Sequence, residues 1–91
     1  MHIDAPFELI LFGGLGDLSQ RKLLPAMYML AFDGRLPDDG KIVIITRQAL
    51  ARDDFLNKVR EALRQHLEAR YFDEACWQRF SAYLLCHTID L

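Results

Sequence analysis

Short apolar runs alternate with longer amphipathic stretches along this sequence. The run Phe7–Phe12 is almost wholly apolar, which is typical of a strand buried on both faces in a parallel sheet covered by helices. Lys41–Thr46 is a second run, again apolar and β-branched, and Tyr83–His87 is a third. We therefore expect three strands at these positions.

The segments between the runs predict helices. A helical pattern follows the first strand, and Pro25 inside it predicts a kink, or a restart with Pro25 in the first turn of the second piece. Asp33 and Gly34 are expected to close that helix. Apolar residues at helical spacing predict two more helices, at Asp53–Leu67 and Glu74–Ala82.

The predicted order is β-α-β-α-(α)-β, and this alternation indicates a parallel sheet with right-handed crossovers. The fold class is therefore α/β: a Rossmann-type three-layer unit over residues 1–91 with a three-stranded parallel sheet, the first half of a doubly wound dinucleotide-binding domain. The expected strand order, 3-2-1, leaves one side of the first strand without a neighbour. We expect self-association through this exposed edge or through helix faces.

Length, charge and cysteine content exclude several classes of protein. The 91 residues allow one domain, and 11 basic against 13 acidic side chains argue against nucleic-acid binding, which needs a basic surface. The apolar runs are too short to cross a membrane, and the first residues lack the basic start of a signal peptide. Two cysteines cannot form a disulfide framework, and no cluster has metal-ligand spacing, so we expect a cytoplasmic protein without a metal.

Three small residues follow the first strand at a spacing of three: Gly13, Gly16 and Ser19. Without side chains at the two glycines, a pyrophosphate can approach the backbone, where the N–H groups and the dipole of a starting helix favour an anion. The pattern is a variant of the dinucleotide-binding turn and not its strict form. A glycine-rich turn without a ligand is the alternative, but the position directly after a buried first strand favours nucleotide binding.

The second strand ends in Thr46 and Arg47, at a position where NAD-selective domains usually carry an acid for the ribose 2′-hydroxyl. A guanidinium there would pair with a 2′-phosphate instead. A solvated arginine without a ligand is the alternative. The sign of the charge favours NADP as the cofactor, with NAD as the second candidate.

The segment from Gly13 to Pro25 reads GGLGDLSQRKLLP and resembles the signature that opens glucose-6-phosphate dehydrogenases. The resemblance runs from Phe7 to the last residue, but it covers only the beginning of the family's protein. It implies the N-terminal NADP-binding part of an enzyme that oxidises glucose 6-phosphate to 6-phosphogluconolactone in the pentose phosphate pathway, with hydride transfer to NADP. The family's catalytic His-Asp pair and sugar-phosphate site lie outside these 91 residues, so the chain alone is expected to be inactive.

The resemblance also implies which residues bind the cofactor. Arg47 is expected to face the adenosine 2′-phosphate, and the last two residues are expected to edge the adenosine pocket. The full implied set is Gly13, Gly14, Leu15, Gly16, Asp17, Leu18, Arg47, Asp90 and Leu91.

Three residues near the turn differ in role from the main cofactor-binding set or depart from the family pattern. Lys22 resembles the lysine that reaches toward the substrate and the nicotinamide. Leu15 departs from the family pattern, which often has Ser, Thr or Lys, so a contact near the 2′-phosphate is lost, which counts against the preference for NADP that Arg47 indicates. Asp17 is well placed to cap a helix, and we favour this role over a direct catalytic one.

Two functions other than the cofactor-binding part of a dehydrogenase are conceivable for an α/β unit of this size. A stand-alone, non-catalytic nucleotide-binding or interaction module that kept the turn is the alternative. A receiver-type phospho-acceptor domain needs an acidic cluster beside the first strand, and Glu8 and Asp17 do not make one. Glucose 6-phosphate is expected as a partner of the complete enzyme only.

Overall fold

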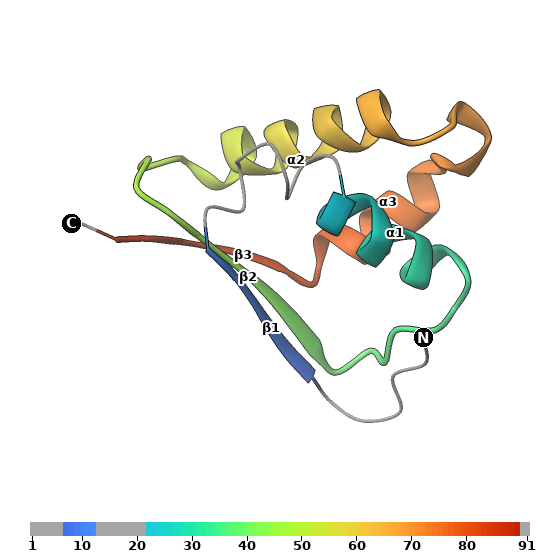
Figure 1. Ribbon diagram of the computed structural model, residues 1–91, viewed down its shortest axis with the longest axis horizontal. Helices are drawn as coiled ribbons and strands as arrows, with labels where there is room; N and C mark the ends of the chain where they lie inside the picture. Colours follow the sequence, from blue (N-terminus) through green and yellow to red (C-terminus); the bar gives the residue numbers. More distant parts are fainter. Residues whose placement is uncertain (1–6, 13–21, 90–91) are drawn as a thin grey trace.

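The chain folds into one sheet with helices packed against it (Figure 1). The computed structural model describes residues 7–12 and 22–89. In chain order the elements are β1 (Phe7–Phe12), α1 (Leu24–Phe32), β2 (Gly40–Thr46), α2 (Arg52–His66), the 3-10 turn η2 (Ala69–Tyr71), α3 (Glu74–Ser81) and β3 (Leu84–Thr88). The order β-α-β-α-(α)-β predicted from the sequence is confirmed.

All three strands are parallel and lie in the order β1-β2-β3, so β2 is the central strand. The register pairs Leu11 of β1 with Ile44 of β2, which is paired in turn with Cys86 of β3. Read from the other edge, this is the predicted order 3-2-1. The α/β class and the three-stranded parallel sheet of a Rossmann-type unit are therefore confirmed.

Proline and glycine determine where α1 begins and ends. Pro25 lies in the first turn of α1, where its missing N–H removes no helical hydrogen bond. At the other end, Gly34 has a φ of 71°, a backbone conformation that favours glycine. The N–H groups of Gly34 and Arg35 donate to the carbonyls of Ala31 (3.1 Å) and Leu30 (2.8 Å), which forms a Schellman cap. The predicted place of Pro25 in the first turn of a helix and the stop at Gly34 are confirmed, whereas the first helical piece, expected from Asp17, lies outside the described residues.

The three helices cover the same face of the sheet, and α1 packs against both α2 and α3 (Figure 1). Both crossovers advance along the sheet in the same direction, and crossovers between parallel strands are right-handed as a rule, which places their helices on one side. The core lies between these two layers. Its largest fully buried side chains are Leu24, Tyr28, Ile42, Ile44, Phe55, Val59, Leu63, Cys76, Phe80 and Leu84.

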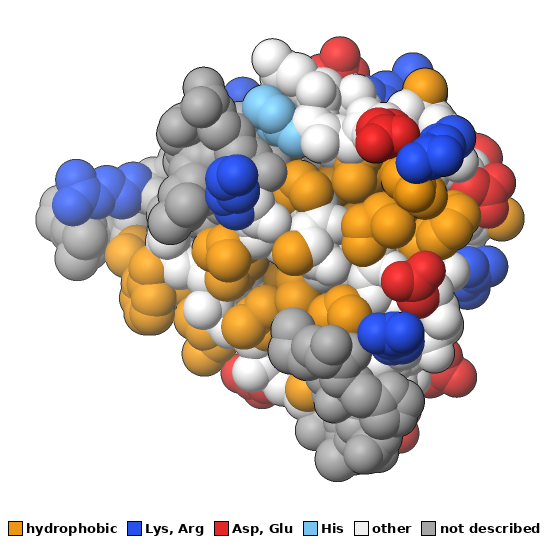
Figure 2. Space-filling model, turned by 45° about the vertical axis from the view of Figure 1, so that its right-hand side comes forward, with side chains coloured by type: hydrophobic (Ala, Val, Ile, Leu, Met, Phe, Trp, Pro, Cys, Tyr) orange, Lys and Arg blue, Asp and Glu red, His pale blue; other side chains and the backbone are white. Residues whose placement is uncertain are grey.

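The opposite face of the sheet is open in the described part of the chain. Ile10 and Phe12 of β1 keep 48% and 77% of their surface exposed, and Leu85 of β3 keeps 42%. The expectation that β1 is buried on both faces is therefore wrong for these residues. In a doubly wound domain the second half of the fold covers this face, so the described residues form two layers of the expected three. Hydrophobic side chains also reach the surface in the view of Figure 2, with charged side chains around them.

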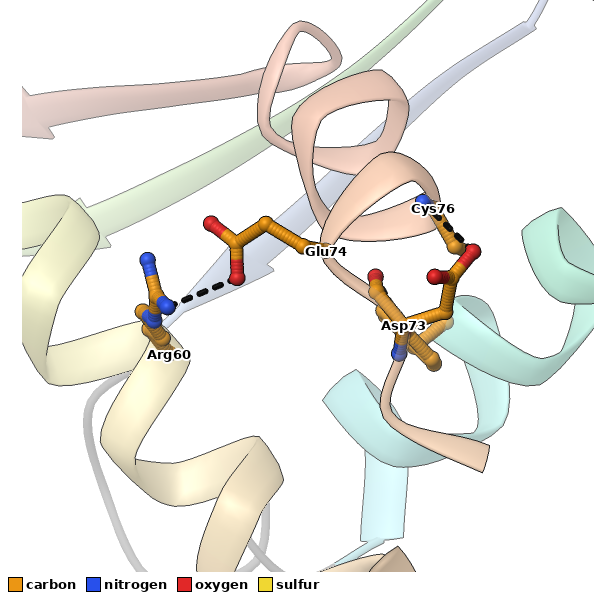
Figure 3. A network of polar contacts seen from close by, with 5 residues as sticks. Arg60, Asp73, Glu74 and Cys76 are labelled. Carbon is orange, nitrogen blue, oxygen red and sulfur yellow. Dashed lines mark hydrogen bonds and ion pairs between the residues drawn. The ribbon is translucent and has the colours of Figure 1, made fainter. Parts of the chain in front are cut away.

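Polar contacts join the three helices around the start of α3. Asp73 occupies the N-cap position, and its carboxylate accepts a hydrogen bond from the Cys76 N–H at 3.3 Å (Figure 3). Arg60 of α2 pairs with Glu74 of α3 at 2.7 Å. The Tyr28 hydroxyl of α1 donates to the Asp73 carbonyl at 3.3 Å and accepts from the Asp73 N–H at 3.1 Å. Because Arg60 of α2 and Tyr28 of α1 both bond to the start of α3, these contacts hold the three helices together.

Candidate functional site

The carboxyl ends of the three strands meet at one edge of the sheet. The register places Phe12, the last residue of β1, beside Ile45, and it pairs Thr46 of β2 with Thr88 of β3. The Ile89 N–H donates to the Thr46 carbonyl at 2.9 Å, which extends the ladder past the end of β3. Ligands of open α/β sheets bind outside the carboxyl ends of the strands. This edge is therefore the candidate cofactor site.

Arg47 is the first residue after β2, so the sheet places it at the candidate edge. It begins a bend in the chain and is exposed to solvent. The hydroxyl of Thr46, which precedes Arg47, accepts a hydrogen bond from the N–H of Gln48, which follows it, at 3.1 Å. An exposed guanidinium at this edge is suited to an anionic group, because its planar fork matches phosphate oxygens.

The predicted phosphate-binding segment connects β1 to α1, since β1 ends at Phe12 and α1 begins at Leu24. Lys22 is exposed and lies just before α1, and its role toward a substrate stays a prediction. The other predicted site residues lie outside the described residues, and their roles also stay predictions. They are Gly13, Gly14, Leu15, Gly16, Asp17, Leu18, Asp90 and Leu91.

Thr46 and Gln48 belong to the candidate site as well, although neither was predicted as a site residue. A local signal for their contact is present in the sequence, because a threonine hydroxyl often accepts a hydrogen bond from the backbone two residues on. No local signal exists for the contact between Ile89 and Thr46. It joins residues far apart in the chain and depends on the strand register.

A hollow of about 550 Å³ lies at the opposite end of β1 and β2. Its lining includes Glu8, Asp38 and Asp39, and carboxylates repel the phosphates of a dinucleotide. Phe7, Gly40 and Lys41 complete the lining. This hollow is therefore a poor site for the cofactor that the sequence predicts.

Burial within the fold alters the ionisation of three side chains. It raises the pKa of Tyr28 to about 12, and it also raises the pKa of Tyr83 and of the Cys86 thiol. In each case the apolar surroundings disfavour the charged form. The Tyr83 hydroxyl donates to the Pro37 carbonyl at 2.8 Å, a bond that holds the loop before β2. These shifts arise from packing, and we assign no acid–base role to them.

Residues 7–12 and 22–89 form neither a metal-binding cluster nor a membrane-spanning helix. No group of three or more His, Cys, Asp or Glu side chains in that part of the chain is placed to hold a metal ion. None of the helices formed by these residues has the length and apolar character needed to cross a bilayer.

Comparison with known proteins identifies the family. Residues 10–91 match the family described as glucose-6-phosphate dehydrogenase, NAD binding domain. The chain belongs to the glucose-6-phosphate dehydrogenase family. The resemblance carried by the glycine segment is thereby confirmed.

Curated glucose-6-phosphate 1-dehydrogenases are similar to almost the whole chain. The protein of Rhizobium meliloti (strain 1021) is 35% identical over 85 residues, and that of Gluconobacter oxydans (strain 621H) is 38% identical over 85 residues. Each match covers 93% of this chain and 17% of the relative. The chain thus spans less than one fifth of the length of these members of the family.

Solved structures of the family share the fold. Glucose-6-phosphate 1-dehydrogenase from Mycobacterium avium matches with a TM-score of 0.81 at 27% identity, over 93% of this chain and 18% of that one. A glucose-6-phosphate dehydrogenase in complex with its substrate glucose-6-phosphate matches with a TM-score of 0.80 at 27% identity, over 99% of this chain and 18% of that one. The sheet and helices of this chain therefore have the fold of the family's NAD-binding domain.

Proposed function

We propose that this chain binds NADP and forms the N-terminal cofactor-binding part of a glucose-6-phosphate dehydrogenase. The observation that carries the proposal is the position of Arg47, exposed at the carboxyl edge of the sheet in a chain of this family. A guanidinium can pair with a 2′-phosphate through two parallel charge-assisted hydrogen bonds. The 2′-hydroxyl of NAD offers no matching charge, so the interaction favours NADP.

The groups at the candidate edge fit an anionic dinucleotide. Besides the guanidinium, Thr46 and Thr88 carry hydroxyls and Gln48 carries an amide. None of residues 10–12, 45–48 and 87–89 is acidic. The glycine segment would add main-chain N–H groups for the pyrophosphate. The nicotinamide, when bound, supplies the hydride acceptor, while the protein binds and orients it.

The proposed reaction belongs to the complete enzyme. There, glucose 6-phosphate would be oxidised to 6-phosphogluconolactone in the pentose phosphate pathway, with transfer of a hydride to NADP. Lys22 would extend toward the substrate from the start of α1. Because this chain spans only 17% of its curated relatives, we propose that it has no turnover alone. The two free cysteines, Cys76 and Cys86, are in keeping with the cytoplasm as its location.

Calorimetric titration of the chain with NADP and NAD tests the proposal. The expected result is weak binding with a clear preference for NADP, because one mononucleotide unit retains only the adenosine half of the site. Arg47→Ala should remove the preference while NAD binding stays the same. The matched control Arg64→Ala removes an exposed guanidinium from α2 and should leave the preference intact. Equal affinities of the unmodified chain for the two cofactors would refute the proposal.

A stand-alone, non-catalytic nucleotide-binding module is the second candidate function. It is considered because residues 10–91 match a family described by NAD binding, a property that such a module would retain. Sequencing the gene downstream of residue 91 separates the two candidates. A continuous reading frame that encodes the catalytic histidine segment supports the enzyme, and an early stop codon supports the module.

We also infer that the 91-residue chain self-associates. The sequence predicts the exposed edge of β1 or helix faces as the interface, and we propose that a second copy instead covers the open face of the sheet beside that edge. The register aligns Ile10, Val43 and Leu85 in one row across this face, and Phe12 extends the apolar surface. Exposed apolar surface of this kind marks interaction sites. The chain spans 17% of its relatives, so in a pure sample the available apolar partner is another copy of the same face.

Light scattering on two lysine variants tests this inference. Ile10→Lys places a charge on the open face and should give a monomer. Phe32→Lys changes an exposed apolar side chain of α1 by the same substitution and should leave the dimer intact. The opposite pattern would assign the interface to the helices, and a monomeric unmodified chain at high concentration would contradict self-association.

A further inference from the structure

Thr46 accepts hydrogen bonds through both its side chain and its main chain at the candidate edge. Its Oγ1 atom accepts from the Gln48 N–H at 3.1 Å. Its carbonyl accepts from the Ile89 N–H at 2.9 Å, and its neighbour in the sheet is Thr88. One residue therefore connects the end of β2, the bend that follows it and the end of β3.

Arg47 lies inside the small ring that the Thr46–Gln48 bond closes. The bond fixes the backbone on both sides of Arg47, so it limits the directions in which the exposed side chain leaves the sheet. Limiting those directions lowers the entropy that an arginine loses when it binds an anion. The hydroxyl of Thr46 can thus strengthen the binding of an anion by Arg47 without contacting the anion itself.

We propose that Thr46 is a positioning residue for Arg47 and sets the strength of the preference for a 2′-phosphate over a 2′-hydroxyl. The proposal rests on the proposed NADP binding through Arg47. Threonine suits the position because its branched side chain is favourable in a strand, while its hydroxyl closes the bend. Valine keeps the branched shape and removes only the acceptor, so Thr46→Val isolates the hydroxyl.

The experiment compares the ratio of dissociation constants for NAD and NADP in four chains by calorimetry. Thr46→Val should lower the ratio roughly twofold to tenfold, the range that one hydrogen bond of this kind supplies, by weakening NADP binding alone. Thr46→Ser retains the hydroxyl and should restore the ratio. Ser81→Ala is the control, because it removes a hydroxyl that donates to the Gln78 carbonyl at 2.9 Å in α3, away from the candidate edge, and it leaves the Thr46–Gln48 bond in place.

A double variant links the effect to Arg47. In an Arg47→Ala background, adding Thr46→Val should change NADP affinity no further, because the side chain that Thr46 positions is gone. Circular dichroism of each variant checks the fold. If Thr46→Val fails to fold, the pair Thr46→Ser and Thr46→Ala makes the same comparison of a chain with and without the hydroxyl.

The outcomes distinguish this proposal from the proposed function. An unmodified chain with no preference for NADP refutes the proposed function, and the role of Thr46 falls with it. A preference that Arg47→Ala removes but Thr46→Val leaves unchanged refutes the positioning role alone. Equal weakening of NADP and NAD binding by Thr46→Val also overturns it, since a merely structural effect does not select between the cofactors.

Discussion

Removing the hydroxyl of Tyr28 should make the stability of this protein respond differently to alkaline pH. Tyr28 lies in α1 with 0% of its surface exposed. Its hydroxyl donates to the Asp73 carbonyl and accepts from the Asp73 N–H, so it joins α1 to the start of α3. Burial raises its pKa from 10.0 to about 12. Tyr28→Phe keeps the ring and removes both the hydrogen bonds and the ionisable group.

Two opposing contributions set the difference in stability between Tyr28→Phe and the unmodified chain: the lost hydrogen bonds, which destabilise the variant, and the ionisation of Tyr28 at high pH, which destabilises only the unmodified chain. Near pH 7 the Tyr28→Phe variant should be less stable by about 1–2 kcal/mol, because the backbone of Asp73 loses a partner. The folded state holds the Tyr28 proton more tightly than the unfolded state, so this stabilisation is complete below pH 10 and is lost as pH rises through about 12. A pKa raised from 10.0 to about 12 corresponds to a loss on the order of 2–3 kcal/mol in the free energy of unfolding of the unmodified chain at high pH. The Tyr28→Phe variant has no hydroxyl to ionise and does not lose this stability.

Urea unfolding followed by the fluorescence of Trp77, at intervals from pH 7 to pH 12, measures both terms. The unmodified chain should be the more stable at pH 7, and the difference should shrink above pH 10 and vanish or reverse near pH 12. Tyr71→Phe, which removes the hydroxyl of a half-buried tyrosine, is the control for general alkaline unfolding. A difference between the unmodified chain and Tyr28→Phe that stays constant over this pH range would refute the reasoning.

Two further substitutions test how local geometry stabilises the fold. Gly34→Ala should lower the free energy of unfolding in urea by about 1 kcal/mol, because the backbone φ of 71° is unfavourable for alanine although an added Cβ would meet no neighbouring atom. Gly34→Asn should lower it less, since asparagine tolerates this conformation better, and an equal loss for the two variants would contradict the reasoning. Arg52→Met should lower the free energy of unfolding by about 1–2 kcal/mol, because the guanidinium donates to the carbonyls of Leu84 (3.0 Å) and Ser81 (3.4 Å). Since these acceptors are uncharged, the loss should persist in high salt, and a loss that salt abolishes would count against the hydrogen bonds.

Much of the fold could be predicted from the sequence because the deciding signals are local. The apolar runs specify strands through side-chain burial, and Pro25 and Gly34 specify where α1 begins and ends through their backbone conformations. Right-handed crossovers allow more than one sheet order, and the glycine segment after β1, which is typical of a dinucleotide-binding unit, favours the observed order 3-2-1 among them. The position of Arg47 at the carboxyl edge follows from the same reasoning, since it directly follows a strand.

Other features could not be predicted, because they depend on residues that are distant in the chain. The apolar pattern of β1 indicates burial on both faces, and half of a doubly wound domain predicts some uncovered surface, yet only the assembled layers identify Ile10 and Phe12 as the side chains that lie on it. The local pattern reports that a side chain is apolar, and tertiary packing decides what covers it.

By itself, the sequence determined the strands, the described helices, their order and the place of Arg47 directly after a strand, since each of these depends on neighbouring residues. Only the tertiary structure decided which face of the sheet the helices cover, that Tyr28 bonds to Asp73, and that Thr46 meets Ile89. Such contacts depend on strand register and helix packing, and the core as a whole fixes both.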